Sequence, residues 1–208
     1  IKEIYILIEE NLYPADWVTE PLHCLNAMIT QKLFKERLYD ILDKVFAGVI
    51  KTQNESVRNL SKSVLLNFVE NSPMSKNLLE KFILKLVNNV NFDELEGREV
   101  VVEILHKFVL KFPINLYEEH VNVIQLALIT GIVNENNFQL KQKMKIVVSQ
   151  IFLNMNHFEM NKEIQNFIDY CNNFLENDNL ETQRAGIILL DSLFTAGIND
   201  NRVKSKMK

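Results

Sequence analysis

The residues of this chain that could bind a metal or transfer a proton are few and scattered. Only one histidine, His120, closely follows two carboxylates, Glu118 and Glu119. Adjacent residues on a helix point in different directions, so this cluster is a weak candidate for a metal site. A solvated surface is the preferred interpretation. The four histidines of the chain are His23, His106, His120 and His157.

Sequence motifs of catalysis and of nucleotide binding are missing as well. The chain contains no G-x-x-x-x-G-K, G-x-G-x-x-G, H-E-x-x-H or G-x-S-x-G segment, and these are the patterns that cradle phosphates, hold zinc or expose a nucleophilic serine. We therefore predict that the protein is not an enzyme. We expect it to bind no cofactor, no metal and no small-molecule substrate.

The two cysteines could form a disulfide or stay reduced. Cys24 and Cys171 lie far apart in the sequence, and each is surrounded by apolar residues at helical spacing. Free cysteine is among the most buried residue types. The preferred interpretation is two reduced thiols in the core, and a disulfide is the alternative.

A set of basic residues is the strongest candidate for an interaction site. Each lies near the start of an expected helix, where a cation is mildly unfavourable because that end of the helix dipole is positive. One explanation is pairing with nearby acids such as Glu55, Glu94, Glu96, Glu135 and Glu181. The other is a row of cations that contacts a partner such as RNA, although a net charge of −4 argues against a surface that binds nucleic acid as a whole. Pairing is preferred, and the candidates are Arg58, Arg98, Lys141, Lys143, Lys145 and Arg184.

The elements that carry these residues show helical periodicity. From Val57 to Val69, apolar residues recur at offsets that place them on one face of an α-helix. Asn71, Ser72 and Pro73 end that helix, and a second apolar face follows before the pattern restarts. Glycines (5) and prolines (4) are too few for the many tight turns of an all-β fold. No apolar run reaches the roughly 18–20 residues needed to cross a bilayer.

The first helices of successive pairs align with one another. A basic residue near each start is followed ten residues later by a large apolar one, namely Phe68, Phe108, Ile151 and Phe194, so we predict equivalent buried positions for these four. The units repeat at steps of 40, 43 and 43 residues, which is typical of HEAT and armadillo arrays. The predicted fold is an all-α solenoid of HEAT/armadillo-like antiparallel helix pairs, one segment over 1–208, with pairs near 22–52, 55–91, 96–133 and 138–176 and end helices at 1–12 and 182–195.

Both ends of the chain indicate a fragment of a longer array. The first residue is Ile1, and neither end helix carries the polar face that caps a solenoid. Within the array, Asp93 and Glu96 have capping-box spacing. Gly97 follows in the first turn of that helix, where glycine costs about 1 kcal/mol relative to alanine. We expect close packing of the preceding helix to require it.

Several segments between Pro21 and about Met155 resemble a known family. They are Ser56-Val-Arg-Asn-Leu, Phe68-Val-Glu-Asn-Ser-Pro, Asn88-Asn-Val-Asn-Phe, Glu94-Leu-Glu-Gly-Arg98 and Lys111-Phe-Pro, together with the helix over Pro21–Lys32. In this succession the chain resembles the down-regulated-in-metastasis family, the homologs of component 20 of the small-subunit processome. It departs from the family pattern at Phe92-Asp93, in place of Tyr-Glu, and in the loop at Asn134–Asn137.

The resemblance implies a non-catalytic helical scaffold of the nucleolus that is needed for processing of small-subunit ribosomal RNA. It implies processome proteins as partners, with pre-ribosomal RNA or small nucleolar RNA near the basic edges. The alternative is a HEAT adaptor of another pathway, either a nuclear-transport receptor or a phosphatase or kinase scaffold.

Overall fold

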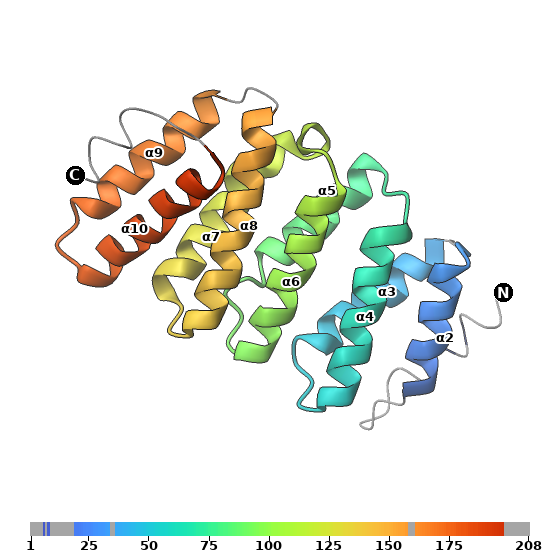
Figure 1. Cartoon of the computed structure of the whole chain (residues 1–208). Helices are drawn as coiled ribbons and strands as arrows, with labels where there is room; N and C mark the ends of the chain where they lie inside the picture. Colours follow the sequence, from blue (N-terminus) through green and yellow to red (C-terminus); the bar gives the residue numbers. More distant parts are fainter. Residues whose placement is uncertain (1–5, 7, 9–18, 34–35, 158–160, 198–208) are drawn as a thin grey trace. The chain divides into compact units, whose positions relative to one another are not determined.

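In a computed structural model of the chain, the described residues are 6, 8, 19–33, 36–157 and 161–197, and they contain helices but no strand (Figure 1). The predicted all-α solenoid fold is confirmed. The α-helices are α2 (Thr19–Thr30), α3 (Glu36–Val49), α4 (Glu55–Asn71), α5 (Lys76–Val87), α6 (Leu95–Lys111), α7 (Val121–Asn134), α8 (Phe138–His157), α9 (Asn161–Leu175) and α10 (Leu180–Thr195), and two 3₁₀ turns, η1 (Ile114–Leu116) and η2 (Glu118–His120), precede α7.

The chain divides into two compact units. Unit 1 comprises Ile1–Ser75 and Phe92–Lys111, and unit 2 comprises Lys76–Asn91 and Phe112–Lys208. That the chain acts as one solenoid segment stays a prediction. The predicted end helix at 1–12 lies outside the described residues, apart from Ile6 and Ile8. No helix of the described part is long and apolar enough to span a membrane.

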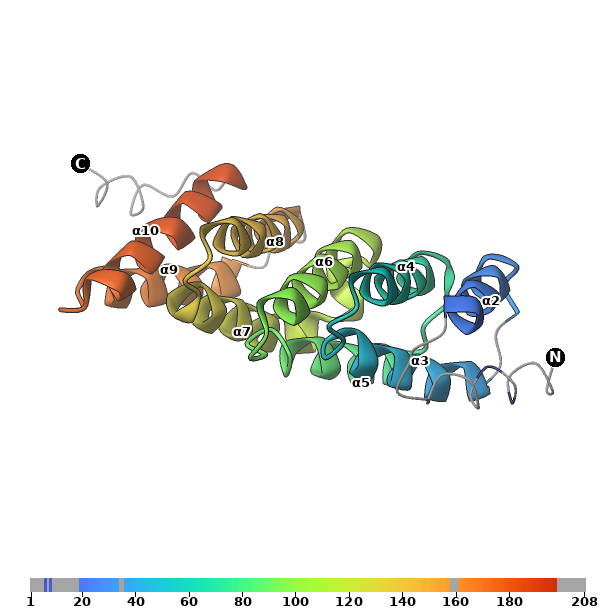
Figure 2. The ribbon, with the colours of Figure 1, turned by 90° about the horizontal axis from the view of Figure 1, so that it is seen from below.

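In unit 1, helices α2, α4 and α6 pack side by side, and α3 packs against α4 from the second layer (Figure 2). The rings of Tyr39 on α3 and Phe68 on α4 pack edge to face, with their centroids 5.9 Å apart. An amide contact joins α2 to α4, because Asn67 Nδ2 donates to Asn26 Oδ1 at 2.6 Å. An aromatic contact therefore joins α3 to α4, and a polar contact joins α2 to α4.

In unit 2, α8 and α10 lie in one layer and α5 and α7 in the other, while α9 packs against α10 (Figure 2). The Phe152 and Phe167 rings meet edge to face at 4.3 Å between centroids, and both are buried. Offset or edge-to-face pairs of this kind are the preferred geometry of aromatic side chains. The core of this unit thus lies between its two helix layers.

The first intrahelical hydrogen bonds fix the register of the repeat. The backbone N–H groups of Arg58, Arg98, Lys141 and Gln183 donate to carbonyls four residues earlier, at 2.9–3.1 Å. These four residues therefore occupy the same position in α4, α6, α8 and α10. The basic residue that the sequence aligned in α10, Arg184, lies one place further along.

This register decides which large residues are buried. Phe68, Phe108 and Ile151 follow the aligned position by ten residues and are at most 1% exposed, as predicted. In α10 the tenth residue is Leu193, which is fully buried, whereas Phe194 is half-buried. The prediction for Phe194 was wrong because one residue turns a helix by about 100°.

Gly97 occupies a position where α4 and α8 carry large apolar residues. Val57 and Leu140 immediately precede the aligned residue in those helices, and both are buried. In α6 the corresponding Cβ atom would lie 2.6 Å from the carbonyl oxygen of Ile50 and 2.9 Å from Cδ1 of Phe92. The expected close packing is present, but the backbone neighbour is Ile50, one residue after the end of α3, and not the immediately preceding helix α5.

Replacing Gly97 with alanine is expected to destabilise the chain by about 1–3 kcal/mol, the usual cost of overpacking. The clash with a backbone carbonyl outweighs the gain of about 1 kcal/mol in helix propensity. Gly131→Ala is the matched control, because its Cβ would meet only side chains, the flexible end of Met144 at 3.0 Å and Val90 at 3.2 Å. Urea denaturation followed by circular dichroism measures both variants, and equal stabilities for the two would contradict the assignment.

Candidate functional site

The aligned basic residues of unit 1 bind the loop that leads into their own helix. Arg58 Nη1 donates to the carbonyl oxygen of Thr52 at 3.3 Å. Arg98 Nη1 donates to the carbonyl oxygens of Phe92 at 2.8 Å and of Asp93 at 2.7 Å. Carbonyl oxygens carry partial negative charge, so these bonds offset the unfavourable place of a cation at a helix start.

The same contact recurs at the aligned residue of α10, which is Gln183. Its Nε2 donates to the carbonyl oxygen of Asn177 at 2.7 Å, again six residues earlier. A neutral amide can replace a guanidinium here because the acceptor is a carbonyl oxygen, which needs only a donor. The repeated position therefore closes the loop before the helix, and a positive charge is not essential to it.

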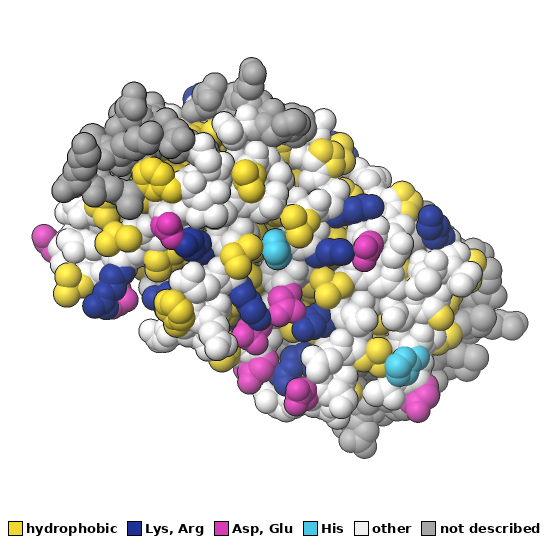
Figure 3. Space-filling model, in the orientation of Figure 1, with side chains coloured by type: hydrophobic (Ala, Val, Ile, Leu, Met, Phe, Trp, Pro, Cys, Tyr) yellow, Lys and Arg dark blue, Asp and Glu magenta, His cyan; other side chains and the backbone are white. Residues whose placement is uncertain are grey.

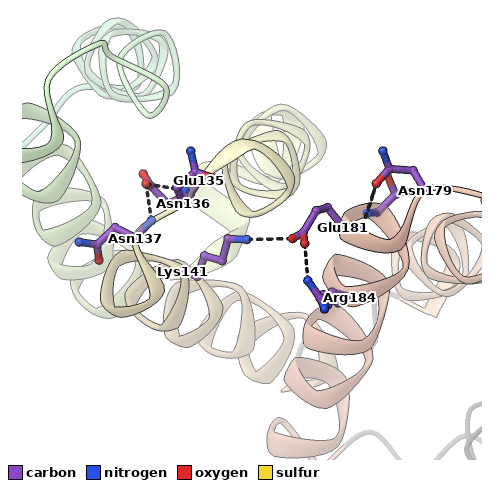
Figure 4. A network of polar contacts seen from close by, with 8 residues as sticks. Glu135, Asn136, Asn137, Lys141, Asn179, Glu181 and Arg184 are labelled. Atoms are coloured by element: carbon purple, nitrogen blue, oxygen red, sulfur yellow. Dashed lines mark hydrogen bonds and ion pairs between the residues drawn. The ribbon is translucent and has the colours of Figure 1, made fainter.

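Lys141 and Arg184 are brought together by an acid of α10 (Figure 4). Lys141 Nζ lies 3.9 Å from Glu181 Oε2, and Arg184 pairs with the same carboxylate. The pairing predicted for Arg184 with Glu181 is thus present. Glu135, the acid nearest to Lys141 in the sequence, instead accepts hydrogen bonds from the backbone N–H groups of Asn136 and Asn137 at 2.9 and 2.8 Å.

The remaining candidates of α8 are also partly covered. Lys145 pairs with Asp191 of α10, and its side chain is only 19% exposed. The side chain of Lys141 is 16% exposed, and Lys143 is half-buried. Phosphate binding needs Lys or Arg side chains that a phosphate group can reach and that are free to neutralise it. Lys141 and Lys145 are better placed to hold α8 and α10 together.

Unit 1 uses the same arrangement between α4 and α6. Lys62 pairs with Glu103 at 2.8 Å, and Lys107 pairs with Glu70 at 3.2 Å. Figure 3 shows acidic and basic side chains close to each other on the face it presents. Surface pairs of this type contribute only about 0–1 kcal/mol each, but they neutralise cations that an RNA would need.

The sequence interpretation missed a set of asparagine caps. Asn54, Asn137 and Asn179 each lie four residues before the aligned position. Their Oδ1 atoms accept from the backbone N–H groups of Val57 at 3.1 Å, of Leu140 at 2.9 Å, and of Glu181 and Thr182 at 2.8 and 3.2 Å. Asparagine is among the best N-cap residues. An asparagine four residues before both Arg58 and Lys141 was the signal in the sequence that could have revealed these caps.

The capping prediction for α6 was wrong by one residue. Glu94 occupies the position of the three asparagines, because its carbonyl oxygen accepts from the backbone N–H of Arg98 at 3.1 Å. Asp93 lies one residue earlier and contributes its own carbonyl oxygen to the Arg98 side chain. The preference of acidic residues for helix starts could not show which of the neighbours Asp93 and Glu94 precedes the first turn.

The two cysteines have different surroundings. Both are free, but Cys24 is exposed, so its predicted place in the core was wrong. It lies on the solvent side of α2, next to the buried Leu25. Cys171 is buried as predicted, and burial raises its pKa to about 12.

We expect thiol reagents to distinguish these cysteines. Because the thiolate is the reactive species, the folded chain at pH 8 should react rapidly at Cys24 only, and Cys171 should react once urea unfolds the chain. Peptide mapping after a short iodoacetamide pulse measures the two sites separately. Equal labelling of both cysteines in the folded chain would contradict the buried position of Cys171.

Comparison with known proteins gives two relatives in sequence. One, from Schizosaccharomyces pombe, is 27% identical over 112 residues, which is 54% of this chain and 4% of that protein. The chain is similar to U3 small nucleolar RNA-associated protein 20. The protein of the same name from Saccharomyces cerevisiae is 24% identical over 125 residues, 60% of this chain and 5% of that protein. The chain thus spans a small part of the length of these relatives.

No protein-family model matches the chain. Two engineered proteins with crystal structures from the Northeast Structural Genomics Consortium have TM-scores of 0.49 and 0.47. The first is 11% identical to this chain, and the alignment covers 92% of this chain and 47% of that protein. The second is 9% identical, and the alignment covers 99% of this chain and 94% of that protein.

Proposed function

We propose that the chain is a non-catalytic scaffold segment of the small-subunit processome, which supports processing of pre-ribosomal RNA and assembly of the small ribosomal subunit in the nucleolus. The observation that carries this proposal is the sequence similarity to U3 small nucleolar RNA-associated protein 20 from two yeasts. Its partners are then other processome proteins. The helix pairs are assigned to the HEAT/armadillo class on their repeat length.

The contacts of the basic residues support a structural role for them. Arg58 and Arg98 bind loop carbonyls, and Lys141 and Lys145 pair with acids of α10. A scaffold needs side chains that fix its own geometry, so that separate contacts with an assembling particle stay in register. Linked weak contacts then raise the effective concentration of the next one.

Deletion of residues 19–197 from the full-length protein tests the proposed function in cells. We expect precursors of the small-subunit RNA to accumulate while large-subunit RNA matures normally. Immunoblotting checks that the shortened protein persists, and Leu110→Ala in the full-length protein, a change at an exposed site, provides a control with normal processing. Normal RNA processing by a stable deletion protein would contradict the proposal, and a defect in nuclear import would favour the adaptor alternative.

Charge reversal tests direct RNA contact through the basic candidates. Replacing Lys141, Lys143 and Lys145 with glutamate should lower the stability of the chain, because it breaks the pairs of Lys141 and Lys145 with α10. The affinity for structured RNA should stay unchanged. Arg98→Ala should likewise lower stability alone. If RNA does bind this face, the affinity of the lysine variant will fall, and the slope of binding against salt will flatten by about one unit for each phosphate that the variant no longer neutralises.

A further inference from the structure

Helix α7 has an unusual surface for a helix that faces solvent. None of its residues, from Val121 to Asn134, is charged. Ile124, Leu128 and Ile132 are buried, but Val123 and Leu126 are 40% and 59% exposed. A surface helix normally carries charged or polar residues on its outer face. The other exposed residues of α7, Asn122, Thr130 and Asn134, are polar but neutral, so this face is uncharged and has an apolar patch at Val123 and Leu126.

A groove in unit 2 adjoins these exposed residues. It has a volume of 240 Å³ and lies between α7 and α9. Its lining includes the buried residues Ile129 and Phe167, and the exposed residues Val123 and Leu126 of α7 and Tyr170 (52%) of α9. Sites for small molecules begin at about 300 Å³. The groove is therefore better suited to one or two large side chains of a partner protein than to a cofactor.

The polar residues around the groove favour a partner of positive charge. Glu163, which is half-buried, lines the groove beside the neutral side chains of Asn122 and Asn166. α9 also carries Asp169, and its one cation is Lys162. Because α7 contributes no charge, the two helices together carry a net charge of −1. Phosphate groups would be repelled here, whereas lysine or arginine would be attracted.

We propose that the α7–α9 groove binds a short amphipathic helix of a partner protein, which inserts a large apolar side chain and places a lysine or arginine one turn away, beside Glu163. Two neighbouring helices with an apolar groove between them form a common receptor for a third helix. This inference rests on the proposed scaffold function and extends it by giving the chemistry of one partner. The experiment below can contradict helix binding by the groove and leave the scaffold function intact.

Selection from a peptide library tests the proposal with the purified chain. The probe is a phage-displayed library of helix-forming peptides about 16 residues long, since shorter isolated helices are marginal in water. Clones that bind the chain are counter-selected against the Leu126→Asp variant. We expect the recovered peptides to share an aromatic residue or leucine with a basic residue three or four positions away.

Affinities of the selected peptides complete the test. Fluorescence anisotropy should show that the selected peptides bind Leu126→Asp and Glu163→Lys with an affinity about tenfold lower or more. A tenfold loss of affinity equals about 1.4 kcal/mol. The matched control is Ile187→Asp on α10, which is 53% exposed and outside the groove and should bind normally. Thermal unfolding checks that each variant folds, and Leu126→Gln replaces Leu126→Asp if that variant does not fold.

Three results would overturn the inference. The selection could yield no clone that discriminates against Leu126→Asp, or it could yield peptides rich in acidic residues. Light scattering could also show that the chain self-associates and that Leu126→Asp abolishes this, which would assign the groove to a second copy. In each case the proposed function in ribosome assembly would remain testable by the deletion described above.

Discussion

Replacing Phe108 with alanine is expected to lower the free energy of unfolding by about 3–5 kcal/mol, the usual cost of removing a buried aromatic side chain. Phe108 lies on α6 in unit 1 and is fully buried. The substitution removes apolar contacts and leaves a cavity that the neighbouring helices can close only in part. Urea denaturation followed by circular dichroism measures the decrease in stability.

Leu110→Ala is the control for that experiment. Leu110 lies on the same helix but is 55% exposed, so its truncation should change stability by no more than about 0.5 kcal/mol. A denaturation midpoint that stays the same in Phe108→Ala would contradict the alignment of α4, α6 and α8. Equal decreases in the two variants would also contradict it.

A comparison of Leu193→Ala with Phe194→Ala tests the corrected register of α10. Leu193 is fully buried, and its truncation should cost about 2–5 kcal/mol. Phe194 is larger but half-buried, so its truncation should cost clearly less. The same denaturation experiment measures both variants. A larger decrease in stability for Phe194→Ala would restore the alignment in which Arg184 is the equivalent of Arg98.

The helices could be predicted from the sequence because their evidence is local. Apolar residues at helical spacing, ended by Pro73 or Pro113, mark the places where α4 and α6 end. Burial of Phe68 and Phe108 follows from the same spacing. The prediction fails in α10 because Arg184 and Phe194 have the expected types at the expected separation. Only the hydrogen bonds of Gln183 show that the pattern is displaced by one residue.

The partners of the basic residues could not be predicted in the same way. Proximity in sequence suggested Glu135 for Lys141, but the pair forms with Glu181, which lies far along the chain. Glu135 was already used by two backbone N–H groups at the end of α7. The lack of charge in α7 is visible in the sequence. That Leu126 and Tyr170 line one groove depends on how α7 and α9 pack, which periodicity does not determine.

Crosslinking of the intact protein in living cells tests the proposed scaffold role most directly. A photoreactive amino acid at position 126, with a second variant at position 187 for comparison, would capture the proteins that contact unit 2. We predict crosslinks from this segment to protein components of the small-subunit precursor, with position 126 linked to a basic helical segment. Crosslinks confined to nuclear-transport cargo, phosphatases or kinases would contradict the account.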